Sequence, residues 1–467
     1  MFAKRRPVST VVESKLEFYP KDVVRVHYHH LKNIPDNVSP GRRQFFEILY
    51  LAIESRSWSV TIEPQGEVVR VRGRRDGAWR LLASYPAALH QSVADEIARF
   101  MRIDLRFGGN IFDNGFMLVV FSEDDWIELF VNVMGSIKGL IFHFAFRRRE
   151  KSFDADLNKL GFEKNSLATF IKAVDAKNGL VLITGPTHAG KSILTYSVLV
   201  RRLARGDSVV TVEAPRKFFL ANAVQLGLER NESYEIGVKR ALAYDTRVLM
   251  VQELSGCKTW EMAMAEAKSS RLVIAATHTS DAVAGLHQPL MLREYGHQAD
   301  GQDSPAIPLD PEQIAAAIRL VCSPRVLRRL CDHCRRRERA PVQAFRQAGL
   351  EIDAPETMTV YTASGCQECG GTGFSGLFGI YEVLPVSKEM KKLIVGRRPL
   401  AEFASQARKE NLSSLREMAL RRALAGETSF QEAILETPPP FYVRHAKSIH
   451  RPIYMGEKDY VAPPDDE

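Results

Sequence analysis

Residues 179–192 read GLVLITGPTHAGKS, and this stretch decides the class of fold. A short run at Leu180–Thr184 leads into a loop that fits the pattern GxxxxGK[ST], and apolar residues at helical spacing follow the loop. Glycines in such a loop let backbone N–H groups turn inward around phosphates, and the following helix adds the positive end of its dipole. The order strand, glycine-rich loop, helix therefore predicts a nucleotide site, and a chance glycine-rich turn explains the pattern poorly.

The loop supplies the residues that we expect to hold ATP. Lys191 would reach the β- and γ-phosphates, and the hydroxyl of Ser192 would ligate Mg²⁺. The helix after the loop continues through Ile193 and Leu203 and ends at Gly206. The predicted ATP-binding residues of the loop are Gly185, Pro186, Thr187, His188, Ala189, Gly190, Lys191 and Ser192.

Three more short apolar runs, at residues 209–212, 248–251 and 272–276, alternate with helical segments and predict an α/β sheet. Glu253 follows the second run, where a carboxylate can polarise water or hold Mg²⁺ through water. A solvated glutamate at a strand end fits the same spacing equally well. Glu213 ends the first run and has the same ambiguity. His278 follows the third run, where it can sense the γ-phosphate, although spacing alone favours an ordinary loop histidine.

The N-terminal third of the chain has a different pattern. Residues 1–40 are polar and interrupted by prolines, and a helix is predicted from about Gly41 to Ile53. Strands at 59–62 and 68–72, a helix at 87–102 and further strands up to Phe146 then predict an α+β module.

The most membrane-like stretch, residues 129–146, includes Lys138 and alternates apolar with other positions near its end. This pattern favours a buried strand over a membrane-spanning helix, which needs about 20 apolar residues. No apolar segment of a secretory signal follows the basic residues 4–6. We therefore expect a cytoplasmic protein with peripheral membrane contact.

Four of the six cysteines form two CxxC pairs, Cys331/Cys334 and Cys366/Cys369. Two such pairs point four thiolates at one ion, so the spacing predicts a closed structural zinc site, with four reduced cysteines as the alternative. The net charge of +8 is spread among interspersed acidic and basic residues, which gives no diagnosis of nucleic-acid binding. The arginines at 335–337 and 339 are interpreted as a solvated charged face.

The order of these motifs resembles the type II secretion and type IV pilus assembly ATPases, over roughly Phe45 to Glu436. The resemblance rests on the approach to the loop at 179–187, the acidic box at 211–215, the strand and Gln-Glu at 248–254, the histidine box at 276–282, the two cysteine pairs with residues 370–374 and 379–384, and the arginine-rich stretch at 70–77.

The resemblance implies a PAS-like N-terminal α+β module followed by a RecA-like P-loop NTPase domain with a zinc-binding subdomain. The implied organisation is an irregular segment at 1–40, the N-terminal module at 41–148, a linker at 149–178, the ATPase core at 179–325, the zinc-binding subdomain at 326–384, a helical region at 385–436 and a flexible tail at 437–467.

The same resemblance assigns roles to residues. It makes Glu253 and Glu213 catalytic or Mg²⁺-organising carboxylates and His278 a contact of the γ-phosphate. Arg70, Arg72 and Arg74 become candidates for positive charge supplied to the phosphates, against the competing interpretation of a surface arginine run. The zinc ligands are the same four cysteines.

The family pattern also implies a function: a homo-hexameric cytoplasmic ATPase that hydrolyses ATP at the inner membrane. It would power type IV pilus assembly, including conjugative or type IVb pili, or type II secretion, with a polytopic inner-membrane protein as partner. The tetracysteine region favours assembly over retraction.

The chain departs from the family at several positions. Ala214 replaces an aspartate, Ser255-Gly256 replaces Arg-Asp, His188 replaces a small polar residue, and Phe130 stands where an arginine is frequent. These departures keep open a nucleotide-binding scaffold with little turnover. A nucleic-acid translocase is the other alternative, disfavoured because a basic tract interleaved with aromatic residues is missing from the sequence.

Overall fold

In the computed structural model the chain forms two compact units. One unit is residues 1–156 with the segments 196–206 and 216–225, and the other is the rest of the chain. Among the described residues, no helix combines the length and the apolar character that crossing a membrane requires. The described residues are 11–12, 23–75, 78–105, 112–123, 125–148, 153–154, 156–214, 216–218, 220, 222–228, 232–294, 307–353 and 356–439.

The first unit is built on a seven-stranded sheet in the order β2-β6-β7-β8-β3-β4-β5. Its neighbouring strands are antiparallel, except that β2 and β6 are parallel. The strands are β2 (Arg25–His27), β3 (Ser59–Gln65), β4 (Val68–Arg75), β5 (Ala78–Pro86), β6 (Phe112–Ser122), β7 (Asp125–Ser136) and β8 (Gly139–Arg148). The helical elements are α1 (Tyr28–Lys32), α2 (Pro40–Glu54), η2 (Ala87–Leu89) and α3 (His90–Met101), and β1 (Val11–Val12) pairs with β9 (Phe153–Asp154).

Apolar faces of α2 and α3 pack on this sheet and form its core. Phe45 of α2 and Ile97 of α3 share a buried cluster with Phe142 and Phe144 of β8. Burying such a side chain contributes about 1.5–3 kcal/mol. The predicted strand near Phe146 is therefore confirmed, because its alternate residues face this core and are fully buried.

A second seven-stranded sheet, which lies in the second unit except for the first two residues of β12, has the order β12-β11-β13-β14-β10-β17-β20. The strands β11, β13, β14, β10 and β17 run parallel, and β20 is antiparallel to β17. The strands are β10 (Gly179–Thr184), β11 (Val209–Glu213), β12 (Val224–Gly227), β13 (Val248–Val251), β14 (Leu272–Thr277), β17 (Ile318–Leu330) and β20 (Phe374–Pro385). Parallel strands place their carboxyl ends at one edge of the sheet, which is where ligands bind in α/β folds.

Helices and short strands complete this part of the chain, although residues 196–204 of α5 are counted with the first unit. They are η4 (Leu157–Lys159), α4 (Lys164–Val174), α5 (Lys191–Ala204), α6 (Tyr234–Leu242), α7 (Gly256–Ser269), α8 (Ala282–Met291), β15 (Arg293–Glu294), β16 (Ile307–Pro308), α9 (Pro311–Ala317), β18 (Arg336–Pro341), α10 (Val342–Gln347), β19 (Thr357–Thr362), α11 (Lys388–Val395), α12 (Leu400–Lys409), α13 (Leu415–Leu424) and α14 (Phe430–Glu436).

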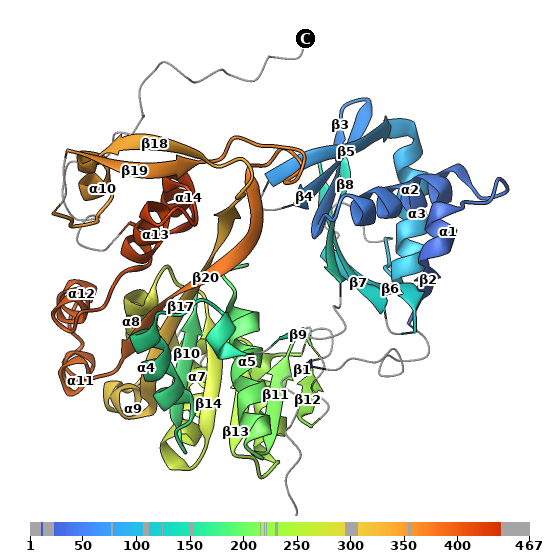
Figure 1. The fold of residues 1–467 in the computed structure, drawn as a ribbon. Helices are drawn as coiled ribbons and strands as arrows, with labels where there is room; N and C mark the ends of the chain where they lie inside the picture. The colour runs from blue at the N-terminus through green and yellow to red at the C-terminus, as the bar shows by residue number, and fades with distance from the viewer. Residues whose placement is uncertain are drawn as a thin grey trace, which may run out of the picture. The chain divides into compact units, whose positions relative to one another are not determined.

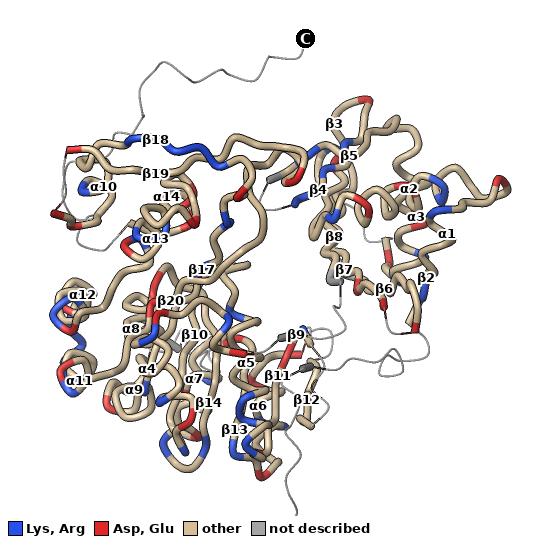
Figure 2. The backbone as a smooth tube through the Cα atoms, in the orientation of Figure 1, with Lys and Arg blue, Asp and Glu red and all other residues tan. Residues whose placement is uncertain are grey.

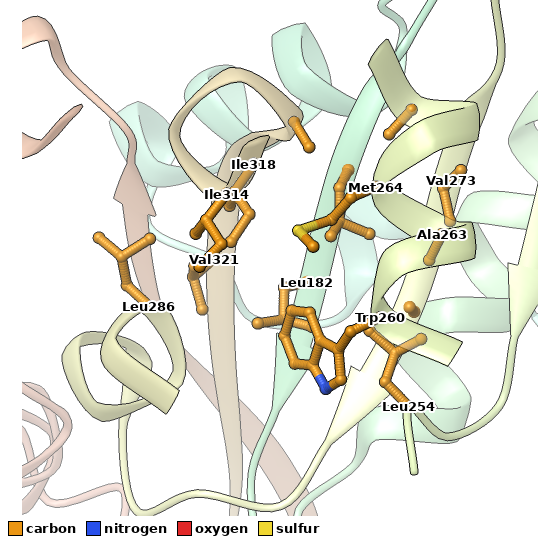
Figure 3. Packing of buried hydrophobic residues seen from close by; sticks show 14 of the residues in the cluster. Leu182, Leu254, Trp260, Ala263, Met264, Val273, Leu286, Ile314, Ile318 and Val321 are labelled. Atoms are coloured by element: carbon orange, nitrogen blue, oxygen red, sulfur yellow. The ribbon is translucent and has the colours of Figure 1, made fainter. Parts of the chain in front are cut away.

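The core of the parallel sheet forms where α7 and α9 meet the strands. Figure 3 shows Trp260 and Met264 of α7 close to Leu182 of β10, with Ile314 of α9 and Val321 of β17 nearby. All five side chains are essentially buried. The predicted strands of the α/β sheet are confirmed, because each apolar run lies within a buried strand of this sheet.

The strands β17 and β20 are longer than the other strands of this sheet and leave it together as an antiparallel pair (Figure 1). A second apolar cluster forms beside their far ends from β18, β19, α10, α13 and α14, with Phe345, Val360 and Phe430 among its members. One continuous ribbon therefore joins the parallel sheet to the subdomain that contains the cysteines.

Candidate functional site

The glycine-rich loop joins the end of β10 to the first residue of α5, as predicted. Its backbone has positive φ angles at Gly185 (155°), His188 (67°) and Gly190 (93°). A Cβ on Gly190 would lie 3.1 Å from Val326, so a larger residue there would crowd the neighbouring strand as well as strain the backbone. Pro186, Thr187 and His188 are exposed, Ala189 is buried, and Ser192 is partly exposed in the first turn of α5.

Lys191 is folded back onto the loop. Its Nζ donates hydrogen bonds to the carbonyl oxygens of Gly185 and Pro186, the latter at 3.0 Å, and lies 3.3 Å from Nδ1 of His278. Burial lowers the pKa of Lys191 to about 8; nearby Glu253 opposes this shift and Arg325 adds to it. Phosphate groups bound in the loop would favour the charged ammonium.

Two predicted residues meet Lys191 at the carboxyl edge of the sheet. His278 follows β14, and its Nε2 lies 3.8 Å from Oε2 of Glu253, which follows β13. Both side chains are about half exposed. The structure therefore brings together Lys191, His278 and Glu253, which are far apart in the sequence, at the mouth of the loop.

Glu213 occupies the same edge on the neighbouring strand, β11, but its environment differs. Its side chain is 1% exposed, and the hydroxyl of Thr211 donates a 2.6 Å hydrogen bond to its Oε1. The pairing Val212↔Val251 places the peptide of Glu213 beside the end of β13. Glu213 thus forms part of the wall of the site, whereas Glu253 stands at its opening.

Arg325 is a buried cation beside the loop that the sequence analysis did not single out. It lies in β17, and its guanidinium donates hydrogen bonds to the carbonyl oxygens of Pro324 (2.7 Å) and Ser280. A Cβ on Gly185 would lie 2.9 Å from its Nη1. Burial lowers the pKa of Arg325, while the carboxylates of Glu382, Asp281 and Glu436 oppose the shift. Arg325 therefore ties the β17–β20 ribbon to the segment that follows His278. β17 contains four arginines, so the sequence pattern alone does not single out Arg325.

Gln252 and Tyr234 were also missed. The side-chain amide of Gln252 is hydrogen-bonded to the backbone of Ala214. Burial raises the pKa of Tyr234, and the negative charges of Glu253 and Glu213 raise it further, so this phenol stays protonated beside both carboxylates. Gln252 belongs to the Gln-Glu pair that follows the apolar run at 248–251, but that pattern assigned a role only to Glu253, and Tyr234 belongs to no such pattern.

The three predicted arginines alternate along β4 in the first unit. Arg70 is exposed, Arg72 forms an ion pair with Glu63, and Arg74 lies over the ring of Trp58 at 5.1 Å from its centroid. That these arginines supply positive charge to the phosphates of a nucleotide stays a prediction.

The four cysteines converge on one point, as the spacing predicts. Cys331 follows β17, Cys334 lies in the turn after it, and Cys366 and Cys369 lie in a turn before β20. Sulfur–sulfur distances are 3.9 Å for Cys331–Cys366, 3.8 Å for Cys334–Cys369 and 3.7 Å for Cys366–Cys369, and all four sulfurs lie within 4.8 Å of one another.

This cluster fits a tetrahedral metal ion. Zn–S bonds of about 2.3 Å in a tetrahedron place sulfurs about 3.8 Å apart, which matches the three sulfur–sulfur distances above. Desolvation acts against ionisation of Cys369, but N–H groups of Cys366 and Gly373 donate to its sulfur at 3.2 and 3.1 Å and the pKa of this thiol is lowered to about 6. Desolvation and the neighbouring cysteines raise the pKa of Cys334 to about 11, so only part of the cluster favours the thiolate before a metal ion binds.

The arginines beside the cysteines lie at the surface, as the sequence predicted. Figure 2 shows Lys and Arg gathered along β18, and Arg336, Arg337 and Arg339 are exposed there. Arg335 is anchored instead, over the ring of Tyr361 at 5.3 Å and through a hydrogen bond to the carbonyl of Gly426.

Together, the parallel sheet and the loop at its edge define a P-loop protein of the α/β class, joined to an α+β module and a four-cysteine subdomain. Residues 37–435 match the family model described as "Type II/IV secretion system protein". The chain belongs to this family, and the predicted family and fold class are confirmed.

Two relatives and one solved structure illustrate the likeness. A type IV pilus assembly ATPase of Myxococcus xanthus is 28% identical over 84% of this chain and 67% of its own length. Type II secretion system protein E of Klebsiella pneumoniae is 30% identical over 86% of this chain and 77% of its own length. The ATPase DotB of Legionella pneumophila has a TM-score of 0.56 at 16% identity, over 86% of this chain and 96% of its own. In five type IV pilus assembly ATPases that it matches, the chain spans between 41% and 67% of the relative's own length.

Proposed function

We propose that this chain is an ATPase that hydrolyses ATP to power the assembly of a type IV pilus or type II protein secretion. The observation that carries the proposal is the cluster of Lys191, His278 and Glu253 at the mouth of a P-loop. Relatives named as pilus assembly ATPases and as a type II secretion protein support the class of process.

The chain's own residues account for the steps of hydrolysis. Lys191 exchanges its two loop carbonyls for phosphate oxygens, which restores its full charge. Glu253, half exposed at the opening, accepts a hydrogen bond from the attacking water and orients it. His278, between Lys191 and Glu253, reports whether the γ-phosphate is present. Glu213, buried at the end of the neighbouring strand β11, would add a second carboxylate for organising Mg²⁺.

Magnesium would be held by the hydroxyl of Ser192 in the first turn of α5, with the carboxylates at the sheet edge acting through water. The donor set fits, because a hydroxyl and carboxylate oxygens are the ligands that Mg²⁺ prefers. When bound, Mg²⁺ would neutralise charge on the phosphate oxygens. Zinc would be held by Cys331, Cys334, Cys366 and Cys369, and a closed site of this kind supports folding and takes no part in catalysis.

We further propose that the protein acts as a homo-hexamer in the cytoplasm, attached peripherally to the inner membrane through a polytopic membrane protein. Arg70, Arg72 and Arg74 of the N-terminal module would then supply positive charge to the phosphates of the nucleotide. The four-cysteine subdomain supports assembly over retraction. Nucleic acid is not expected as a partner.

Phosphate release by the purified protein tests the proposal. Wild type is compared with Lys191→Ala and Glu253→Gln, each with and without DNA and vesicles of anionic lipid. Glu261→Gln is a matched control, because the side chain of this glutamate on α7 is about half exposed and pairs with Lys258. We expect Mg²⁺-dependent release that falls roughly 100-fold or more in both site variants, remains in the control and does not respond to DNA.

Two other results would each select an alternative. Stimulation by DNA would point to a translocase. A wild-type rate equal to that of Lys191→Ala under every condition would point to a nucleotide-binding scaffold. This alternative rests on the departures from the family pattern at Ala214, Ser255 and Gly256.

A further inference from the structure

The backbone ladder between β11 and β13 ends near Gln252, and the side chain of Gln252 continues its hydrogen-bond pattern. The last registered pair between β11 and β13 is Val212↔Val251, and the N–H of Gln252 donates to the carbonyl of Val212 at 3.0 Å. The Gln252 side chain then accepts from the N–H of Ala214 at 2.8 Å and donates to the carbonyl of Ala214 at 3.2 Å. One amide thus satisfies both backbone groups of the residue that follows Glu213.

This two-point contact lies between the two carboxylates of the site. Glu213 precedes Ala214 in the chain, and Glu253 follows Gln252. Each of the two segments also has a backbone hydrogen bond to a further neighbour. The carbonyl of Glu213 accepts from the N–H of Leu228 at 2.9 Å. The N–H of Leu254, next to Glu253, donates to the carbonyl of Ala276 at 2.9 Å. The Gln252 amide is therefore the central link in a row of contacts that fixes both carboxylate-bearing peptides.

A second group converges on the same peptide. The phenol of Tyr234 at the start of α6 interacts with the backbone of Ala214 and lies within the field of Glu213 and Glu253. Since the phenol remains protonated, it can donate a hydrogen bond at the carboxylate edge. Ala214 itself has no polar side chain, so its backbone is what Gln252 and Tyr234 hold.

An amide that pairs with backbone can be purely structural, and this molecule contains such a case. Gln225 accepts from the N–H of Leu220 at 2.7 Å and donates to the carbonyl of Phe218 at 2.9 Å. The chemistry of the two contacts is the same, but Gln225 is not adjacent in sequence to a carboxylate of the site. The position of Gln252 between Glu213 and Glu253 is the difference that bears on catalysis.

We propose that Gln252 is a positioning residue for ATP hydrolysis: its amide clamps Ala214 and thereby holds Glu213 and Glu253 in the geometry that orienting the attacking water requires. The inference rests on the proposed function. Loss of the clamp should mostly spare nucleotide binding, because the loop and Lys191 do not depend on it. It should slow the chemical step, because a displacement of about 1 Å at a catalytic group can cost on the order of 100-fold in rate.

The experiment compares Gln252→Met and Gln252→Asn with Gln225→Met in the full chain. Methionine keeps the length and removes both hydrogen bonds, and asparagine keeps the amide but is one methylene too short to reach Ala214. For each protein, kcat and KM for MgATP are measured, together with the affinity for MgADP and the midpoint of thermal unfolding. We expect kcat to fall roughly 10- to 100-fold in both Gln252 variants, with KM and MgADP affinity within about threefold of wild type. Gln225→Met should keep the wild-type kcat.

The outcomes separate the two proposals. If wild type hydrolyses ATP and the Gln252 variants retain its kcat, the positioning role is wrong while the ATPase proposal stands. If the Gln252 variants lose MgADP affinity and thermal stability in proportion to kcat, Gln252 is structural and the inference also fails. If wild type is no faster than Lys191→Ala, the ATPase proposal fails and takes the inference with it.

Discussion

The four-cysteine cluster and the nucleotide edge lie in the same unit, yet they are assembled in opposite ways. The cysteines come from two turns that flank one antiparallel pair, β17 and β20, so four ligands need only one hairpin-like ribbon to meet. The nucleotide edge draws on β10, β11, β13, β14 and β17, and its members are separated by up to 140 residues, from Gly185 to Arg325. A local site is specified by spacing, whereas a distributed site is specified by strand order and register.

The two sites also differ in what holds them without a ligand. At the nucleotide edge, Lys191, Gln252 and Arg325 already have backbone partners. At the cysteines, the sulfurs contact mainly each other and two N–H groups. We therefore expect the cysteine cluster to depend on its metal for stability far more than the nucleotide edge depends on nucleotide.

The largest predicted effect follows from removing that metal. A strong chelator, or the substitution Cys331→Ser with Cys366→Ser, should destabilise the subdomain by several kcal/mol, because zinc binding contributes on the order of 10 kcal/mol to the folding of such sites. Metal content should be about one zinc per chain in wild type and near zero in the double variant. Thermal unfolding and metal analysis check this. Cys257→Ala, which removes a buried thiol outside the cluster, is the control; an unchanged unfolding midpoint after chelation would contradict the prediction.

A smaller but still large effect is expected where the two regions are connected. Arg325→Met removes a buried guanidinium that faces Glu382 and Asp281, so those carboxylates lose a buried opposite charge. We expect a loss of about 3–5 kcal/mol in the free energy of unfolding. Arg329→Met on the same strand is the matched control, because Arg329 is about half exposed and its ion pair with Glu427 contributes less than about 1 kcal/mol. Urea unfolding measures both, and equal losses would show that burial of Arg325 is not what matters.

The sequence predicted the parts of both sites that follow from local pattern. The loop at 185–192, the apolar strands around it and the cysteine pairs each appear where expected, because apolar runs, glycines and CxxC spacing act over a few residues. Glu253 and His278 were predicted to follow strands, but only strand order reveals that they face each other across β13 and β14.

What escaped prediction depends on register and on burial. Gln252 matters because β11 and β13 pair so that its side chain meets Ala214, and a shift of one residue would turn the amide away. Arg325 matters because it is 5% exposed beside Gly185, and a single sequence does not show which strand lies next to the loop. Tyr234 reaches the edge from a helix that begins about 20 residues after Glu213.

The third prediction concerns charge at the nucleotide edge. The pKa of Lys191 is about 8 in the free protein, so the ammonium loses its proton as pH rises through this value, while bound phosphates would raise the pKa again. Nucleotide binding above about pH 8 must then take up a proton, and the affinity for MgATP should fall by up to tenfold per pH unit. Equilibrium binding between about pH 7 and pH 10 tests this.

The control for this titration is Lys191→Arg, which keeps its charge throughout the range. Glu253, Arg325 and His278 face Lys191 and are unchanged in this variant, so their contribution to any pH dependence is shared by both proteins. If the affinity for MgATP falls with pH equally steeply in wild type and in Lys191→Arg, the pH dependence comes from those groups or from the nucleotide and not from Lys191.

The smallest predicted effect concerns the backbone of the glycine-rich loop. The sequence motif predicted this loop, but it could not show that the backbone is strained. His188 has a φ of 67°, a conformation that costs a residue with a Cβ about 1 kcal/mol relative to glycine. Substitution by glycine also removes the imidazole, so the informative comparison is His188→Gly against His188→Ala, which lose the same side-chain contacts and differ in the Cβ. The strain at a positive φ outweighs the extra freedom of glycine in the unfolded chain, so the glycine variant should be more stable in urea by a few tenths to about 1 kcal/mol. If the alanine variant is the more stable of the two, the positive φ is not retained in solution, and the loop is then held only by the contacts of Lys191 and not by a fixed backbone.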